Sequence, residues 1–159
     1  MQKISPFLWF ENQAEEAAKY YVSLFKNSKM GKVTRYPKGT PLPEGSVMTA
    51  TFVIEGQDFT AMNGGPTYKF TPAISFVVYC DDQAEVDRLW DQLSEGGQTS
   101  QCGWLQDRFG VSWQIVPRVL QELLRGGGDE ARGRRVMTTM LAMEKLEIKP
   151  LEDAYNATP

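Results

Sequence analysis

The chain has 159 residues, 42% of them hydrophobic, which suits one domain or two half-domains that share a core. Its formal net charge of −3 argues against a nucleic-acid-binding surface, and no apolar run reaches the roughly 18 residues of a membrane span. Histidine is absent, which excludes Ser-His-Asp and Cys-His catalysis and histidine-containing zinc sites built from this chain alone.

The first half of the chain predicts a strand, a helix and three further strands. Ile4–Phe10 is a short apolar, aromatic-rich run that is typical of a strand. Asn12 followed three residues later by Glu15 predicts a capped helix start, because the pair has the spacing of a capping box. Turn-rich segments then separate three predicted strands, at residues 32–36, 47–55 and 59–63.

The second half repeats the first. Residues 74–85 match residues 4–15 at an offset of seventy, with five identities. Self-similarity at one fixed offset indicates a duplicated supersecondary unit. Asp82 and Glu85 predict the start of the second helix, and strands are predicted at residues 99–102, 104–108 and 111–116.

The remainder of the chain, from Pro117, is predicted to be helical. One short helix precedes Gly126-Gly127-Gly128, a second begins near Asp129, and a last one runs from Pro150 to Tyr155. We expect the apolar stripe of the second helix to be too apolar for water and to pair across a two-fold axis. The stripe consists of Val136, Met137, Met140, Leu141 and Met143.

The order of elements predicts an α+β fold made of tandem βαβββ units with a C-terminal helical tail. Neither a doubly wound sheet nor an immunoglobulin sandwich has this order. We expect the first unit to span residues 1–66, the second 67–117 and the helical tail 118–159, all within one structural domain.

Several motifs resemble the PhnB-like family of the vicinal oxygen chelate superfamily, whose fold is that of glyoxalase I, extradiol dioxygenases and bleomycin-resistance proteins. The resemblance covers nearly the whole chain. Its motifs are Phe7-Leu8-Trp9-Phe10 with Gln13-Ala14-Glu15, the Asn63-Gly64-Gly65-Pro66 turn, residues 103–117, and Arg135–Leu141.

The family often carries the label 3-demethylubiquinone-9 3-methyltransferase, which implies S-adenosylmethionine as a cofactor. Such a cofactor usually needs a glycine-rich loop between a strand and a helix N-terminus. The nearest match, Gly126-Gly127-Gly128, is predicted to follow a helix and to link two helices. The sequence therefore predicts no cofactor.

The resemblance also implies positions at which metal-using members hold their ion, namely the first and last strand of each unit. Alignment by the helix starts places Pro6 and Phe76 on the first strands, and neither can bind a metal. Met62 or Asn63, and Gln114, fall on the last strands. Neutral amides without imidazole or carboxylate make a poor divalent-metal site, so no bound metal is expected.

The candidate ligand-binding residues lie on the predicted strands and their turns. Two curved sheets would form a cleft floored by strand side chains, with aromatic residues for apolar contact and a few polar groups for orientation. Core packing is the competing interpretation of each aromatic residue. The candidates are Trp9, Thr60, Asn63, Tyr79, Trp104, Arg108, Trp113 and Gln114.

Three other features have both a functional and an ordinary interpretation. Cys102 is a reactive thiol or a small buried hydrophobe. The methionine stripe is a flexible lid or simple packing. The arginines of the tail are an anion clamp or a solvated helix face, and they are Arg125, Arg132, Arg134 and Arg135.

Three functional hypotheses follow. The first is metal-free binding of a small aromatic or amphipathic molecule, and the second is an enzyme in which Asp, Glu, Tyr or Cys replaces histidine as acid or base. The third is an interaction module with a filled core. We expect a homodimer, with or without exchanged elements, because each unit presents an unpaired sheet edge. With two cysteines and no signal-like N-terminus, the expected location is cytoplasmic.

Overall fold

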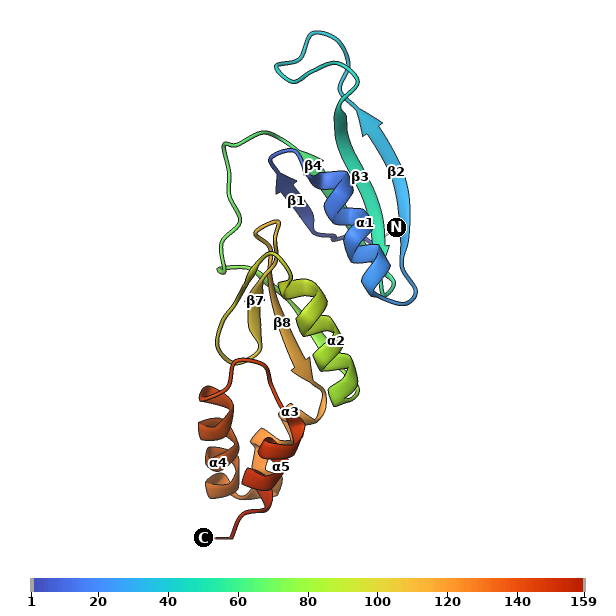
Figure 1. Ribbon diagram of the computed structural model, residues 1–159. Coiled ribbons are helices and arrows are strands. Elements are labelled where there is room, and N and C mark those ends of the chain that lie inside the picture. The colour runs from blue at the N-terminus through green and yellow to red at the C-terminus, as the bar shows by residue number, and fades with distance from the viewer. Residues whose placement is uncertain (1, 159) are drawn as a thin grey trace. The chain divides into compact units, whose positions relative to one another are not determined.

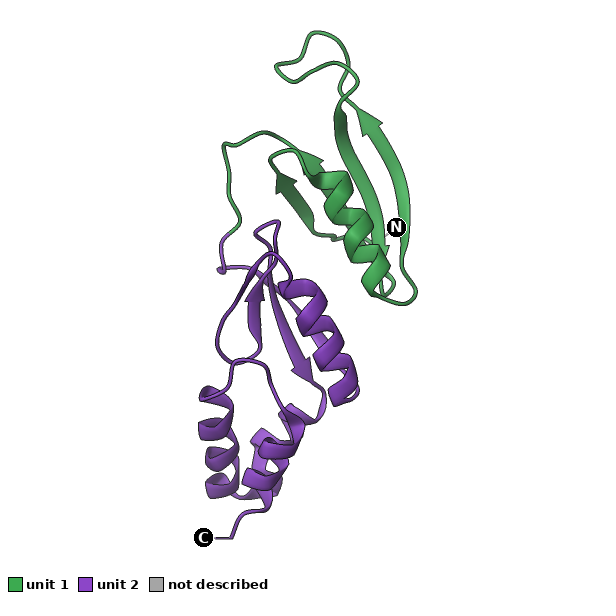
Figure 2. Cartoon of the chain, viewed as in Figure 1, with its two compact units in different colours: residues 1–70 green, residues 71–159 purple. Residues whose placement is uncertain are grey.

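The computed structural model describes residues 2–158 and divides into two compact units, residues 1–70 and 71–159 (Figure 2). Unit 1 contains β1 (Phe7–Phe10), α1 (Ala14–Leu24), β2 (Lys29–Arg35), β3 (Val47–Ile54) and β4 (Gln57–Asn63). Its sheet has the strand order β1-β4-β3-β2, with β1 parallel to β4 and the other neighbours antiparallel. The helix α1 covers one face of this sheet (Figure 1).

Unit 2 repeats this path with β5 (Ser75–Cys80), α2 (Gln83–Ser94), β6 (Gln98–Thr99), β7 (Trp104–Gln106) and β8 (Ser112–Pro117). Its strand order, β5-β8-β7-β6, is that of unit 1, and β5 again runs parallel to β8. The predicted pair of βαβββ units is therefore confirmed.

Strand alternation decides which side chains reach each helix. In β1, Leu8 and Phe10 are buried on the helix side, whereas Phe7 and Trp9 point to the other side and stay partly exposed. In β3, Ala50, Phe52 and Ile54 are likewise buried. Each sheet thus has a face that packs against its helix, α1 or α2, and an opposite face, which we call the open side.

The two helices begin differently, although their sequences repeat. Asp82 caps α2 as predicted, since its carboxylate accepts a hydrogen bond of 2.9 Å from the Glu85 N–H. The predicted cap of α1 at Asn12 is wrong, because α1 starts at Ala14 and its N-cap position is Gln13. The cap comes instead from strand β4, where the Asn63 side chain accepts a hydrogen bond of 2.8 Å from the Ala14 N–H.

Strands β6 and β7 are shorter than predicted. β6 ends at Thr99, because Cys102 and Gly103 both have positive φ angles, of 59° and 84°, and form a turn in place of an extended strand. The turn brings the chain directly into Trp104, the first residue of β7.

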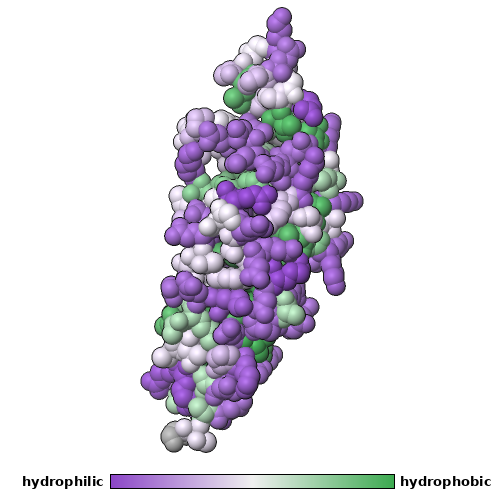
Figure 3. Space-filling model, in the orientation of Figure 1, coloured by the Kyte–Doolittle hydropathy of each residue, from purple (hydrophilic) through white to green (hydrophobic). Residues whose placement is uncertain are grey.

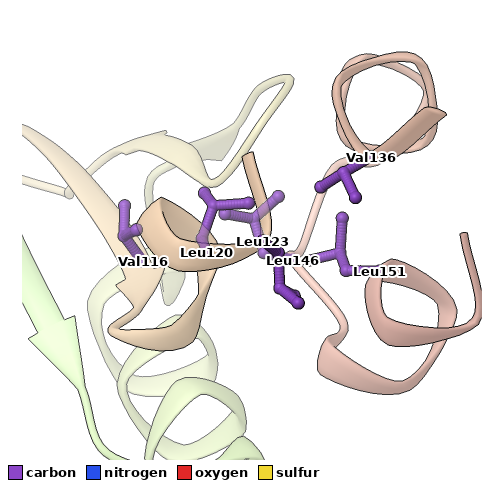
Figure 4. Close-up of a cluster of buried hydrophobic side chains, with 6 residues drawn as sticks. All are labelled: Val116, Leu120, Leu123, Val136, Leu146 and Leu151. Atoms are coloured by element: carbon purple, nitrogen blue, oxygen red, sulfur yellow. The ribbon is translucent and has the colours of Figure 1, made fainter. Parts of the chain in front are cut away.

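The C-terminal helices belong to unit 2. They are α3 (Val119–Arg125), a single 3₁₀ turn at Gly126–Gly128, α4 (Glu130–Leu141) and α5 (Ile148–Asn156). Their buried side chains meet the end of β8 in one hydrophobic cluster (Figure 4), which consists of Val116, Leu120, Leu123, Val136, Leu146 and Leu151.

The apolar stripe of α4 is only partly exposed, which corrects the expectation that it is too apolar to be satisfied within its own unit. Val136 is fully buried, and Met140 and Met143 pack against the hydrophobic cluster. Met137 and Leu141 remain 41% and 58% exposed. Two exposed side chains are too small a patch to require a partner, so the stripe no longer supports a dimer.

Hydrophilic residues predominate on the surface seen in Figure 3, with small hydrophobic areas between them. Among residues 2–158, no helix combines the length and the apolar character needed to cross a bilayer.

Candidate functional site

The open side of unit 1 is built around Trp9. Its indole N–H donates a 3.0 Å hydrogen bond to the Gly65 carbonyl, and the Tyr68 ring meets it edge-on at 5.0 Å between centroids. A side-chain carbon at Gly64 would collide with the indole, so glycine is required for this close approach. The segment 64–68 therefore fixes the orientation of Trp9.

Thr60 lies beside these aromatic residues. Its β1 neighbour is Phe7, which is 59% exposed. The Thr60 side chain makes no hydrogen bond within the described residues. The open side of unit 1 is thus a mixed surface of aromatic rings and hydroxyl groups.

The open side of unit 2 carries Tyr79, Trp104 and Gln114. Trp104 pairs with Gln114 across β7 and β8, so their side chains share one face. The Gln114 amide donates to the Ser75 hydroxyl at 3.0 Å, and Tyr79 is 43% exposed. Three of the candidate residues are therefore brought to one surface within unit 2.

A hollow of about 270 Å³ lies at the β6–β7 edge of this sheet. Trp104 is its aromatic lining residue, and most of the other lining residues are serine, threonine or glutamine. The volume is close to the lower limit of small-molecule pockets, about 300 Å³. Its lining residues are Pro72, Gln98, Thr99, Ser100, Trp104, Leu105, Gln106 and Ser112.

Ser112 is the most informative residue of the hollow, although no sequence pattern pointed to it. It is only 3% exposed, yet its hydroxyl has no hydrogen-bond partner within residues 2–158. The oxygen is not fully enclosed, so it reaches solvent through the hollow. A hydroxyl that lines a hollow without a partner is available to a ligand.

Three sequence candidates have other roles. The Asn63 side chain caps α1 and also donates to the Val47 carbonyl at 3.2 Å, so both ends of its amide are engaged. Trp113 is on the helix side, 3% exposed, and donates to the Asp107 carboxylate at 2.9 Å. Arg108 lies in the turn after β7, with its guanidinium carbon 4.5 Å from the centroid of the Phe109 ring, and does not line the hollow.

Asp107 was missed by the sequence analysis. It is 3% exposed and accepts hydrogen bonds from the backbone N–H groups of Phe109 and Val111, at 2.9 and 3.0 Å, as well as from Trp113. The carboxylate holds the β7–β8 turn together. The local sequence Asp107-Arg108-Phe109-Gly110 signals the turn, but not this role.

Cys80, Asp87 and Lys145 have displaced pKa values, and none of the three lines the hollow. Burial raises the pKa of the Cys80 thiol to about 12, so this cysteine is an inert core residue. Hydrogen bonds from Gln83 and Lys145 lower the pKa of Asp87, and the bond to Asp87 raises the pKa of Lys145. These displaced groups do not support acid–base chemistry at the hollow.

The residues do not fit the divalent metal that the fold implies. The first-strand positions on the open sides carry Phe7, Trp9, Val77 and Tyr79, and Asn63 is committed to α1. Imidazole is absent from the chain, and the described residues contain no cluster of three or more acidic or cysteine side chains suited to an ion. These positions therefore lack the imidazole, carboxylate or thiolate ligands that Zn²⁺ or Mn²⁺ requires.

The sequence profile of the 3-demethylubiquinone-9 3-methyltransferase family matches residues 2–116. The chain belongs to this family. A PhnB protein from Bacillus cereus, described as a 3-demethylubiquinone-9 3-methyltransferase, is 38% identical with a TM-score of 0.68, and the match covers 73% of this chain and 99% of that one. No match was found among curated proteins.

More distant solved structures share the fold. A Pseudomonas aeruginosa protein is 23% identical with a TM-score of 0.62, and the match covers 74% of this chain and 98% of that one. The fosfomycin resistance protein FosX from Listeria monocytogenes is 13% identical with a TM-score of 0.51, over 77% of this chain and 97% of that one. The glyoxalase-type fold expected for the chain is therefore confirmed.

The family label implies a methyl-group donor, but the glycines available do not fit one. Gly126–Gly128 follow helix α3 and not a strand, and they lie beyond the family match, which ends at residue 116. A strand, a glycine loop and a helix N-terminus would be needed in that order.

Proposed function

We propose that this family member binds a small aromatic or amphipathic molecule without a metal, in the hollow of unit 2. The single observation that carries the proposal is Ser112, a buried residue whose hydroxyl lacks a partner within residues 2–158 and which lines the hollow together with Trp104. An aromatic wall with a few polar groups is the usual composition of a small-molecule site.

The chemistry of the lining defines the ligand. The ring of Trp104 favours a flat apolar partner, while Ser112 and Gln106 offer a hydroxyl and an amide for orientation. One amide N–H of Gln106 donates to the Gly110 carbonyl at 3.1 Å, so within the described residues its oxygen and its second N–H remain for a ligand. A single ring that carries both a donor and an acceptor matches these groups and the volume.

The test uses full-length protein labelled with fluorotryptophan and a panel of single-ring amides and phenols, with benzamide as the first probe. We expect benzamide to shift the fluorine resonance of Trp104, identified by its loss in Trp104→Phe, and to raise the melting temperature. Ser112→Ala should weaken binding about tenfold, since one hydrogen bond to the ligand is lost.

Ser94→Ala is the matched control, because Ser94 is a serine of α2 that does not line the hollow. Equal affinities in Ser112→Ala and Ser94→Ala, or shifts confined to the other three tryptophans, would reject this site.

For the assembly we propose a homodimer in the cytoplasm. The support is the set of exposed apolar side chains on the open sides, including Phe7, Val77 and Tyr79, which are 59%, 39% and 43% exposed. Each sheet also has two unpaired edge strands, which favour association.

A further inference from the structure

The C-terminal extension, residues 118–159, is absent from the family match. The family profile ends at residue 116, and the Bacillus cereus relative is covered almost end to end by 73% of this chain. The extension nevertheless belongs to unit 2 and shares the hydrophobic cluster with Val116 of β8. The family profile therefore gives no role for the extension, although Arg135–Leu141 within it was one of the motifs of the resemblance.

The segment between α4 and α5 binds the turn that precedes Trp104. The N–H of Cys102 donates to the Met143 carbonyl at 2.8 Å, and the N–H of Gly103 donates to the Glu144 carbonyl at 2.7 Å. Both residues have positive φ angles, a conformation that costs free energy at a non-glycine residue such as Cys102. The two hydrogen bonds stabilise this conformation.

Gly103 also fits closely against the extension. A Cβ at this position would lie 3.0 Å from a methyl carbon of Leu146 and 2.8 Å from the Ile115 carbonyl oxygen. Leu146 is fully buried in the hydrophobic cluster. The turn is therefore held by side-chain packing as well as by hydrogen bonds.

Helix α2 holds the other side of the same segment. The amide of Gln83 donates to the Leu146 carbonyl at 3.1 Å and accepts from the Ile148 N–H at 2.7 Å. Its N–H also donates to Asp87 at 2.9 Å, and Asp87 forms a 2.9 Å ion pair with Lys145. One side chain thus replaces the pair of backbone hydrogen bonds that a neighbouring strand would give.

We propose that the C-terminal extension positions Trp104 and thereby shapes the hollow of unit 2, with Gln83 as the positioning residue that holds the extension. Trp104 follows the bound turn directly and is tied back into it, since its N–H donates to Gln101 and its carbonyl accepts from Ser100. Ser100 and Trp104 both line the hollow. The ligand part of this inference rests on the proposed function; the positioning of Trp104 does not.

The test replaces Gln83 by methionine, which has a similar size and a good helix propensity but makes neither hydrogen bond. Gln92→Met is the matched control on the same helix, because Gln92 is exposed and accepts a hydrogen bond of 3.1 Å from Arg88 of that helix. Three quantities are measured in full-length protein: amide exchange at Cys102 and Gly103, the fluorine resonance of Trp104, and benzamide affinity.

In Gln83→Met we expect amide exchange at Cys102 and Gly103 to accelerate about tenfold, because the segment that accepts both bonds is released. The Trp104 resonance should move and benzamide should bind about threefold to tenfold more weakly. Gln83→Glu keeps the acceptor for Ile148 but loses the donor to Leu146, so it should give intermediate values. Gln92→Met should match the parent protein.

Two results would overturn the inference. One is unchanged amide exchange in Gln83→Met, and the other is faster exchange with an unmoved Trp104 resonance, which would mean that the extension adds stability only. If benzamide binds nowhere in the parent protein, the proposed function fails, but amide exchange and the fluorine resonance still decide whether the extension positions Trp104.

Discussion

Asp107 shows how a single buried charge can organise a turn. Its carboxylate serves two backbone N–H groups and the indole of Trp113 at 2.9–3.0 Å. We expect Asp107→Ala to lower the free energy of unfolding by about 3–5 kcal/mol, since three buried donors lose their acceptor. Urea unfolding followed by circular dichroism measures the change.

The matched variant Asp107→Asn keeps an oxygen for the backbone N–H groups but turns an amide donor toward the Trp113 N–H. Its loss should be smaller, about 1–2 kcal/mol. Equal losses in both variants would show that charge and not geometry matters at this position.

Asn63 illustrates a cap supplied from a distant part of the sequence. Asn63→Ala should cost about 1–2 kcal/mol of unfolding free energy, because the Ala14 N–H loses its acceptor inside the fold. Asn63→Asp keeps that acceptor and removes only the 3.2 Å bond to Val47, so we expect a smaller loss in urea titrations. An unchanged free energy of unfolding in Asn63→Ala would contradict the role of Asn63 as the cap of α1.

At the scale of elements, the sequence predicted helices and strands correctly where the residues that determine them lie close together in the chain. The Asp82 and Glu85 pair lies within one helical turn, and it predicted the start of α2 correctly. The apolar run of residues 4–10 predicted strand β1, but it left open on which face Trp9 lies. The cap from Asn63 to Ala14 joins residues 49 positions apart, and no local pattern encodes it.

For the candidate site, too, the sequence supplied the residues on the strands but not the way they are brought together in space. Aromatic residues on strands are visible in the sequence, but the face on which each one lies depends on register. Trp104 faces the open side whereas Trp113 faces the helix. Ser112 was missed because a serine in an apolar run carries no signal of the hollow that it lines.

The contact between α2 and the C-terminal extension should depend on pH. The folded-state pKa of Asp87 is lowered below its ordinary 3.8, first by the Gln83 hydrogen bond and then by Lys145. A lowered folded pKa gives stability that is present above the ordinary pKa and is lost as pH falls through the lowered value. Asp87→Asn should therefore destabilise the protein near neutral pH and have no effect in strong acid.

The magnitude should be at most about 1 kcal/mol, because the Asp87 side chain is 45% exposed and solvent screens the pair. Asp153→Asn removes a more exposed pair within α5, 65% exposed at Asp153, and serves as the control. Urea titrations at several pH values measure both variants. If the free energy of unfolding of Asp87→Asn still differs from that of the parent protein in strong acid, the ionised Asp87 carboxylate is not the cause of the difference.

At the scale of the whole molecule, the exposed apolar residues of the open sides predict self-association. Sedimentation at micromolar concentration should report about twice the 17.9 kDa of one chain. Replacing Phe7 and Tyr79 by serine should shift the equilibrium toward the monomer, because apolar area is lost from the interface. Replacing Met137 and Leu141 by serine should leave this equilibrium nearly unchanged. If only the second pair of substitutions produces the monomer, the interface lies on α4.

The duplication placed the same glutamine at the start of both helices, and the two copies now differ. Gln13 is exposed and its side chain makes no capping bond, whereas Gln83 holds two backbone groups of the C-terminal extension. Substitution of Gln13 by nearly any polar residue should therefore leave stability unchanged, while almost every substitution of Gln83 should lower it. Identity between the two halves records common ancestry, and it gives no measure of how freely either copy can still change.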